Sequence, residues 1–457
     1  MKLDPRSAKL VDDFLHGRMS RRQLVVRAAA LGASVPVLTA LNRPSLVAAQ
    51  EAGFGNTPKA EQVDKLILWT RSTPDSPNTT DWQNITNVAA AYTEATGTAI
   101  EMVTVPDADF KQKMGTLAPA GEGPDVYGPI AHDWIGEFAI QGIAAEIPEE
   151  LIEGREDIIP VAFEAATVEG TLSALPLFVE SVGLVYNKDM VPTPPATWEE
   201  LVTMATELTA GDVYGFGFPL LEQYHEGAFF HGLGSYIFQY AEGQFDVDDI
   251  GLNNEGGVAA AMFLRDMFHT RQPPLPPVAI DRTNMHVQQE GMMEASQIAM
   301  TINGPWREAP LTTAGINYGV AKLPTLPGGE SMRPFLGVQC WAASAHSQKL
   351  EAALDFISFA TGTNSVVEQY KGFIKAPVRQ SALDSAEVQA NANMAVWTEQ
   401  AAEGVPMPNI PEMSQVWVPW GDAIDAIIPP NASDEEVQSF LDGAAAQIAE
   451  KIEEARL

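Results

Sequence analysis

Apolar and polar positions after residue 64 follow two alternating periods, one typical of strands and one typical of helices. Three short apolar runs predict strands, at 65–69, 99–105 and 125–127. Between them, Ile85, Val88, Ala89 and Tyr92 share one face of a predicted helix that ends near Gly97, and 110–117 predicts a second helix. This alternation predicts an α/β fold with a mostly parallel sheet, whose ligands bind beyond the carboxyl ends of the strands.

A single carboxylate, Glu180, interrupts an apolar strand pattern within the segment 175–201. A carboxylate in such a run costs free energy unless it is paired or faces a wet cavity. The segment is therefore either an edge strand whose Glu180 points to water, or a crossover between two lobes with Glu180 lining the cleft. Other parts of the chain favour the crossover. After a proline-rich turn, Thr197 and Glu200 form the capping-box pattern that opens a helix.

Aromatic residues mark the second half of the chain. The segment 299–306 reads as a strand broken by Gly-Pro that presents Trp306 from a turn, and 317–324 reads as another strand. A proline-stiffened loop at 406–413 leads into a helix on which Trp417 and Trp420, three residues apart, share one face.

Composition limits the possible functions. A chain of 457 residues is too long for one compact core, so two or three lobes are expected. A net charge of −33 argues against binding to nucleic acid or to anionic lipid. The single cysteine, Cys340, lies in an apolar context and is interpreted as a buried, inert thiol. The scattered histidines and the lack of a glycine-rich phosphate loop give no sign of a metal or cofactor.

The N-terminus resembles a twin-arginine export signal. Arg21 and Arg22 precede a moderately apolar run of seventeen residues, which is short for a membrane span and contains a further arginine. A small-residue pattern at 47–49 places the predicted cleavage point, so residues 1–49 are the signal and 50–63 a flexible leader. The expected location is the periplasm or the outer face of the cell membrane, with the twin-arginine translocase as export partner.

Several longer motifs resemble the periplasmic maltose/maltodextrin-binding proteins, which are extracellular solute-binding proteins of carbohydrate ABC importers. The matching stretches are GPDVYG, AHDWIGEFAIQGIAAEI, the segment 175–201, AMTINGPW, NYGVAKLPTLPGG and MPNIPEMSQVW. The resemblance implies two lobes joined by hinge crossovers near 177–183, 318–321 and Pro377. The implied lobes are 64–177 with 321–375, and 183–318 with 380–457.

The resemblance also implies the ligand-binding residues. Aromatic side chains stack on sugar faces, and carboxylates accept hydrogen bonds from sugar hydroxyls. The carboxylates at the matching positions are Asp133, Glu180 and Glu222, and the aromatic residues are Tyr224, Trp306 and Trp417.

The chain departs from the enteric members in its charged contacts. An arginine after the cleft aspartate is replaced by Trp134, a first-lobe Asp-Lys pair is absent, and Gly421 replaces an arginine of the last motif. Trp134 and Trp420 are candidates to take over these contacts, with Arg71 and Asp75 as weaker ones.

The predicted function is binding without chemistry. The resemblance implies capture of a maltodextrin-type α-glucoside and its delivery to the permease subunits of an ABC transporter. Three alternatives stay open: a binding protein for another disaccharide such as trehalose, a sugar-sensing receptor, and a glycoside hydrolase, for which the chain offers no independent acid–base pair.

Overall fold

A computed structural model describes residues 60–74, 79–241 and 244–456 of the chain. The predicted signal (1–49), most of the predicted leader and the weak candidate Asp75 lie outside the described residues. Within the described residues, no helix is both long and apolar enough to span a membrane.

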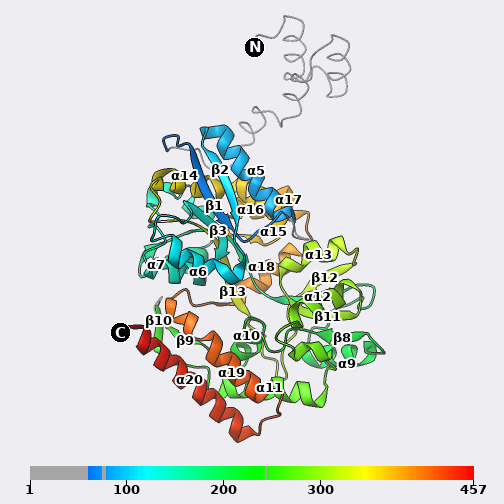
Figure 1. Ribbon diagram of the computed structural model, residues 1–457. Coiled ribbons are helices and arrows are strands. Elements are labelled where there is room, and N and C mark those ends of the chain that lie inside the picture. The colour runs from blue at the N-terminus through cyan, green and yellow to red at the C-terminus, as the bar shows by residue number, and fades with distance from the viewer. Residues whose placement is uncertain (1–59, 75–78, 242–243, 457) are drawn as a thin grey trace, which may run out of the picture. The chain divides into compact units, whose positions relative to one another are not determined.

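The first sheet has seven strands, in the order β14-β6-β13-β3-β1-β2 with β15 paired to β13 (Figure 1). Its strands are β1 (Lys65–Thr70), β2 (Ala99–Thr104), β3 (Val126–Ala131), β6 (Leu175–Glu180), β13 (Phe335–Ala343), β14 (Ala376–Pro377) and β15 (Val405–Pro406). The helices and turns of the same part of the chain are α5 (Thr79–Thr96), α6 (Asp107–Leu117), α7 (His132–Ile140), η1 (Glu149–Leu151), η2 (Arg155–Asp157), α8 (Pro160–Ala166), α14 (Leu350–Ala360), α15 (Thr363–Phe373), α16 (Gln380–Leu383), α17 (Ala386–Gln389) and α18 (Met394–Ala402).

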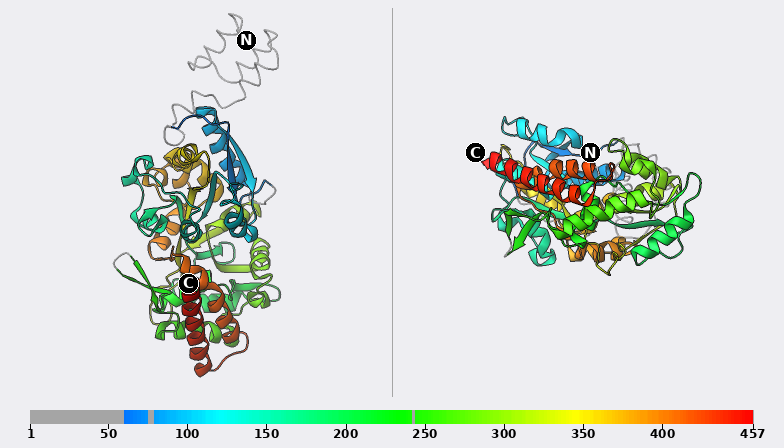
Figure 2. Two further views of the ribbon diagram at one scale, coloured as in Figure 1. Left: turned by 60° about the vertical axis from the view of Figure 1, so that its left-hand side comes forward. Right: turned by 90° about the horizontal axis from the view of Figure 1, so that it is seen from below.

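The second sheet has four strands in the order β12-β7-β11-β8. They are β7 (Gly183–Asn187), β8 (Tyr214–Gly217), β11 (Ile298–Asn303) and β12 (Tyr318–Ala321). The surrounding helices and turns are α9 (Trp198–Leu208), α10 (Gln223–Gly232), α11 (Glu255–Thr270), η3 (Pro277–Ile280), α12 (Met285–Glu294), η4 (Pro305–Arg307), α13 (Glu308–Thr313), η5 (Pro411–Gln415), α19 (Trp417–Ile427) and α20 (Asp434–Arg456). Figure 2 shows α20, in red, running along the outside of this group of helices.

Two short hairpins complete the described elements. One joins β4 (Thr167–Val168) to β5 (Thr171–Leu172), and the other joins β9 (Phe238–Ala241) to β10 (Gln244–Ile250).

The chain crosses between the two sheets at successive strands. β6 ends at Glu180 in the first sheet and β7 begins at Gly183 in the second, so the crossover expected around Glu180 is confirmed. β12 and β13 form the next such pair. Leu323 and Leu326 lie in the segment between β12 and β13. They pack into the hydrophobic core beneath the second sheet, called the second core below, although the predicted boundary assigns residues from 321 onward to the first lobe. The other lobe boundaries stay a prediction.

The structure confirms the predicted strands, the apolar face of the first predicted helix and the predicted capping box. The three predicted strands are β1, β2 and β3, and the apolar face of α5 is buried at all four predicted positions. The side chain of Thr197 accepts from the Glu200 N–H and Glu200 reaches back to the N-cap, which completes the capping box of α9.

The expectation of mostly parallel sheets is wrong in part. β1 pairs with β2 and β3 in parallel, but β13 runs antiparallel to both β3 and β6. In the second sheet β7 runs antiparallel to β11 and β12. The antiparallel pairings arise where the chain crosses from one sheet to the other and returns, because the crossing strands β6, β7, β12 and β13 all take part in them.

Candidate functional site

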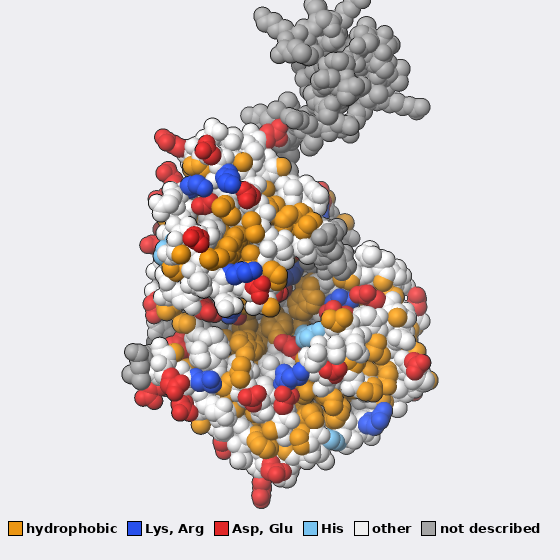
Figure 3. Space-filling model, in the orientation of Figure 1, with side chains coloured by type: hydrophobic (Ala, Val, Ile, Leu, Met, Phe, Trp, Pro, Cys, Tyr) orange, Lys and Arg blue, Asp and Glu red, His pale blue; other side chains and the backbone are white. Residues whose placement is uncertain are grey.

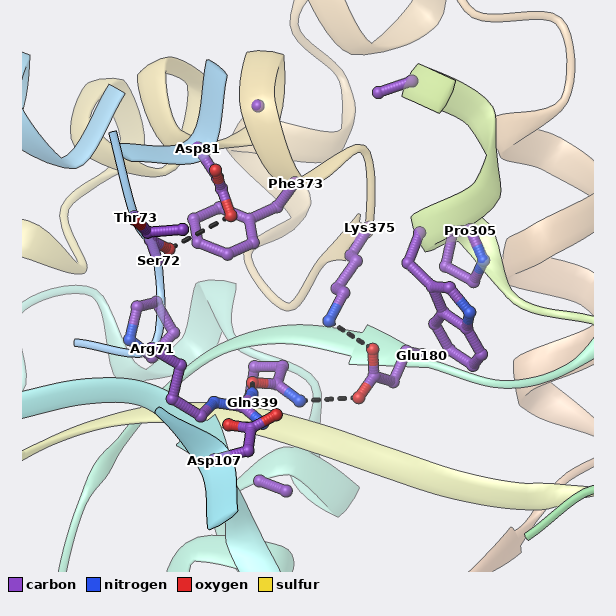
Figure 4. Close-up of a pocket in the computed structure, with 15 residues that line it drawn as sticks. Arg71, Ser72, Thr73, Asp81, Asp107, Glu180, Pro305, Gln339, Phe373 and Lys375 are labelled. Carbon is purple, nitrogen blue, oxygen red and sulfur yellow. Dashed lines mark hydrogen bonds and ion pairs between the residues drawn. The ribbon is translucent and has the colours of Figure 1, made fainter. Parts of the chain in front are cut away.

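A cavity of about 460 Å³ lies at the carboxyl ends of strands of the first sheet. On its other side the cavity is bounded by the η4 turn, which belongs to the second part of the structure, that is, the second sheet with its surrounding helices and turns. Residues that follow or end β1, β3 and β6 line it on one side, and Pro305, Trp306 and Ala309 line it on the other. Figure 3 shows this hollow in the middle of one face of the molecule, and Figure 4 shows its lining side chains. The cavity therefore lies where an α/β fold meets its ligands.

A row of charged and amide side chains forms the cavity floor (Figure 4). Glu180 lies at its centre: Lys375 Nζ is 2.5 Å from Glu180 Oε2, and Gln339 Nε2 donates to Glu180 Oε1 at 2.6 Å. Arg71 donates to Gln339 Oε1 at 3.1 Å and pairs with Asp107 at 3.3 Å. Hydrogen-bond donors and acceptors therefore alternate along the cavity floor.

The electrostatics of this row keep Glu180 charged. Burial by itself raises the pKa of the Glu180 carboxyl, but the ammonium of Lys375 and the amide of Gln339 outweigh it, so the net shift is downward. Asp81 behaves differently at the rim. Burial raises the pKa of the Asp81 carboxyl, although Ser72 Oγ donates to it at 3.1 Å.

A chain of aromatic rings leads from the cavity into the second part. Tyr224 lies 6.3 Å from Trp306 and stacks on Phe335 at 5.9 Å, and Phe335 lies 6.0 Å from Trp417. Trp306, Tyr224 and Trp417 are each half-buried against the second core, whereas Phe335 is fully buried. The structure therefore brings the three predicted stacking residues together, with Phe335 as a connecting ring that the sequence did not reveal.

The phenol of Tyr224 is surrounded by the predicted carboxylates. Burial together with the charges of Glu180, Glu222 and Asp133 raises the pKa of Tyr224 well above its usual value. Its hydroxyl is buried and has no hydrogen-bond partner within the described part of the chain. A protonated, unpartnered phenol is a ready hydrogen-bond donor to a ligand oxygen.

Glu222 is the N-cap of α10. Its Oε2 accepts from the His225 N–H at 3.1 Å and is also bonded to the His225 ring at Nδ1. About a quarter of the Glu222 side chain is exposed, whereas His225 is buried. Burial raises the pKa of the Glu222 carboxyl, but the hydrogen bond and charge of the His225 ring outweigh it and lower the pKa.

Asp133 and Trp134 both lie in the first turn of α7 and are half-buried. The Oδ1 of Asp133 is buried without a partner among the described residues. The Trp134 ring packs 5.8 Å from Phe110 and carries Arg71 at 5.3 Å and Lys111 at 5.2 Å over its face. Trp134 is thus connected to the cavity floor through Arg71, which itself lines the cavity.

Trp420 differs from the other predicted residues because it is fully buried. Its ring stacks on Trp417 with centroids 6.4 Å apart and planes at 6°, and it also packs against Phe230 at 5.0 Å. In this position Trp420 supports Trp417 from behind and has no exposed surface with which to contact a ligand.

Two contributors to the site were missed by the sequence reasoning. Lys375 precedes β14 and Gln339 lies on β13, and both residues line the cavity. Neither belongs to a recognisable motif, and only their pairing with Glu180 reveals them. Among the described residues no group of three His, Cys, Asp or Glu side chains is placed to hold a metal ion.

A second, larger cavity of about 1060 Å³ lies on the other face of β13. Leu336 and Val338 line it, whereas Gln339 lines the first cavity, as expected for the alternation of side chains along a strand. It contains none of the eight predicted binding residues.

Similar proteins were found at the level of family, sequence and structure. A family model described as bacterial extracellular solute-binding protein matches residues 87–396. A galactooligosaccharide-binding protein of Bacillus subtilis is 29% identical, covering 90% of this chain and 95% of that protein. A maltodextrin-binding protein of the same organism is 30% identical, covering 74% and 79%. The structure of a Thermus thermophilus maltotriose-binding protein bound with maltotriose matches with a TM-score of 0.75 and 31% identity, covering 85% of this chain and all of that one.

Proposed function

Because this chain belongs to the bacterial extracellular solute-binding protein family, we propose that it captures a maltodextrin-type α-glucoside in the cavity beside Glu180 and delivers it to the permease of an ABC transporter. A maltodextrin-binding relative from Bacillus subtilis and the Thermus thermophilus maltotriose-binding protein bound with maltotriose support this ligand class.

The observation that carries the proposal is the meeting of two kinds of surface at one cavity. The floor offers alternating donors and acceptors, Arg71, Gln339, Glu180 and Lys375, and the opposite wall offers the ring of Trp306. Sugars present apolar C–H faces edged by hydroxyls, so they need an aromatic surface and both kinds of polar partner. Because the central carboxylate is paired with a cation, the floor suits a neutral ligand better than a charged one.

The proposed mechanism is closure of two lobes around the sugar. Groups from the first sheet (Glu180, Gln339) and from the elements around the second sheet (Pro305, Trp306) line the same cavity, so a sugar that touches both stabilises the closed arrangement. A ligand shifts such an equilibrium only by its differential contacts with the two states. The permease then recognises the closed form.

The ligand contacts that we propose are six of the predicted residues, with the others in supporting roles. Asp133, Glu180 and Glu222 accept hydroxyl hydrogen bonds, and Tyr224, Trp306 and Trp417 contact sugar faces. Trp134 orients Arg71, and Trp420 supports Trp417. No chemical step is proposed: the matching family consists of binding proteins, and Glu226, the buried acid beside Glu222, has no exposed surface with which to reach a glycosidic bond.

We also propose export by the twin-arginine route through residues 1–49. The family description, an extracellular solute-binding protein, supports an exported protein. Expression of the full chain with Arg21 and Arg22 both changed to Lys should leave the protein in the cytoplasm. Export of this variant at the wild-type level would refute the route without affecting the binding proposal.

Thermal unfolding with a sugar panel tests the binding proposal. The protein from residue 50 onward is heated with maltose, maltotriose, trehalose, a galactooligosaccharide, xylobiose or glucose. A ligand at a hundred times its Kd adds about 2.7 kcal/mol to the unfolding free energy and raises Tm. We expect the largest shift with maltotriose. A shift only with trehalose or the galactooligosaccharide would reassign the ligand and keep the site, and no shift with any sugar would overturn the proposal.

A further inference from the structure

A group of buried polar side chains lies behind Glu222, on the α10 side of the site. Four of them carry side-chain atoms that are buried without a hydrogen-bond partner in the described part of the chain, namely Gln223, His225, Glu226 and Gln289. None of them is part of the proposed sugar contacts. Buried polar groups normally have partners, so this group needs an explanation.

His225 is the member of this group that touches a proposed ligand residue. Its ring Nδ1 is bonded to Glu222 Oε2, and the same oxygen accepts its backbone N–H at 3.1 Å. Because an ionised carboxylate only accepts, the ring nitrogen is the donor. Both hydrogen bonds that the Glu222 carboxylate accepts from the described residues therefore end on Oε2, and Oε1 has no partner among those residues.

We propose that His225 is a positioning residue for ligand binding: its ring fixes the Glu222 carboxylate so that Oε1 is presented to a sugar hydroxyl. The inference rests on the proposed function, because it assigns the second layer of the same site. A carboxylate that is itself held by a hydrogen bond loses less freedom when it binds a ligand than one that must first be ordered. His225 supplies this order from a buried position, with only 4% of its side chain exposed.

Glu226 is a second buried acid close to Glu222, and its charge state affects whether Glu222 stays ionised. It lies one turn after Glu222 on α10 and is fully buried. Burial, together with the charge of Glu222, raises the pKa of Glu226 well above its usual value. This upward shift favours the uncharged form of Glu226, which lessens its repulsion of the ionised Glu222.

The other titratable groups around His225 must be separated from its effect. From α12, His286 lies 5.7 Å from the His225 ring and Glu290 lies within reach of its charge. Burial and the neighbouring His225 lower the pKa of His286, and burial raises the pKa of Glu290. Arg282 and Asp425, which pair with each other at 2.6 Å, act on Glu226 from the far side.

The test is the pH profile of sugar affinity in His225 variants, measured by calorimetry with the best sugar of the panel. H225L and H225M remove the ring donor with little change in volume, whereas H225N keeps an N–H donor near the Nδ1 position. We expect H225L and H225M to bind about 10- to 100-fold more weakly at pH 7, the range for a lost charge-assisted hydrogen bond. Their affinity should fall further toward pH 5.5, because without the ring burial dominates and Glu222 takes up a proton.

Three control variants and one double-mutant cycle separate a loss of the ring donor from other effects. H225N should stay within threefold of wild type, and so should H286N, with the wild-type pH profile. H231N changes a buried histidine of the same helix whose ring contacts the Arg333 carbonyl at 3.1 Å, and it should leave affinity unchanged. In the E222Q background, H225M should cost no further affinity.

The outcomes separate the two proposals. Tight sugar binding by the wild type together with unchanged affinity and pH profile in H225L and H225M would overturn the positioning role alone. Equal weakening in H225N and H225M would also overturn it, because it would show a packing effect rather than a donor effect. Absence of binding to every sugar in the wild type would overturn the proposed function and this inference with it.

Discussion

Removal of the Lys375 ammonium tests the charge row of the cavity most directly. Lys375 Nζ lies 2.5 Å from Glu180 Oε2, and the two side chains are only 10% and 11% exposed. Loss of one partner from a buried ion pair costs about 3–5 kcal/mol because the remaining charge stays out of water. The 2.6 Å hydrogen bond from Gln339 remains, so we expect K375M to lose about 3 kcal/mol, at the lower end of this range.

The pH dependence of this loss distinguishes a charge effect from a packing effect. In the wild type the pKa of Glu180 is lowered by Lys375, so the ion pair stabilises the fold above the unfolded carboxyl pKa of about 4.3 and its contribution is lost as pH falls through the folded value. In K375M burial dominates and the pKa of Glu180 rises above the unfolded value. The penalty is then largest near pH 7 and shrinks as pH falls through that raised pKa.

Urea unfolding of the sugar-free protein at pH 7 and pH 5 measures both effects. K371M is the matched control, because Lys371 also pairs with a glutamate, at 2.6 Å, but is half exposed and should cost at most about 0.5 kcal/mol. The double variant K375M/E180Q removes the stranded charge and should recover most of the loss. The reasoning fails if K375M is as stable as the wild type, or if its loss is the same at both pH values.

Three further predictions concern the aromatic chain and the buried titratable groups. W306A and W417A should each weaken sugar binding by about 2–4 kcal/mol in calorimetry, as expected of central anchors, whereas W420A should chiefly lower the unfolding free energy in urea, by about 3–5 kcal/mol, because Trp420 is fully buried. At pH 4, where the acid is mostly protonated in both states, E226Q should change the unfolding free energy by less than about 1 kcal/mol. Because the folded pKa of Glu226 is raised, the wild type should lose stability relative to E226Q as pH rises, and parallel urea-derived profiles would contradict this assignment. Burial lowers the pKa of His231 to about 4, so its ring signals in an NMR titration should not move between pH 5.5 and 8.

Local patterns were enough to predict the elements that border the site. The strands β1, β2 and β3 and the helices α5 and α9 follow from apolar periodicity and from the Thr197–Glu200 capping box, because these signals depend on residues within a few positions of each other. The lone carboxylate by itself left Glu180 either on an edge strand that faces water or at a crossover, and the resemblance to maltose/maltodextrin-binding proteins led to the crossover that the structure shows.

The partners of Glu180 were not readable because they are far away in sequence. Gln339 is 159 residues from Glu180, and Arg71 is 268 residues from Gln339. Lys375 lies in a segment without any distinctive pattern and reaches Glu180 only because β14 pairs with β6. The burial of Trp420 was missed for a related reason: a shared helix face with Trp417 does not say which of the two rings lies nearer the core.

The row of charged and amide side chains on the cavity floor meets the chain of aromatic rings where Glu180 approaches Tyr224. A glycine on β13, Gly337, leaves room for this approach. Gly337 pairs with Glu180 across β13 and β6, and a Cβ at Gly337 would lie 3.1 Å from Glu180 Cγ and 3.2 Å from the Tyr224 hydroxyl. The absence of a side chain at Gly337 therefore lets an acid of the first sheet approach a phenol of α10. Glu180 is also the last residue of the strand that crosses between the sheets. In the mechanism that we propose, a ligand that binds both Glu180 and Tyr224 therefore acts directly on the crossover and couples sugar binding to lobe closure.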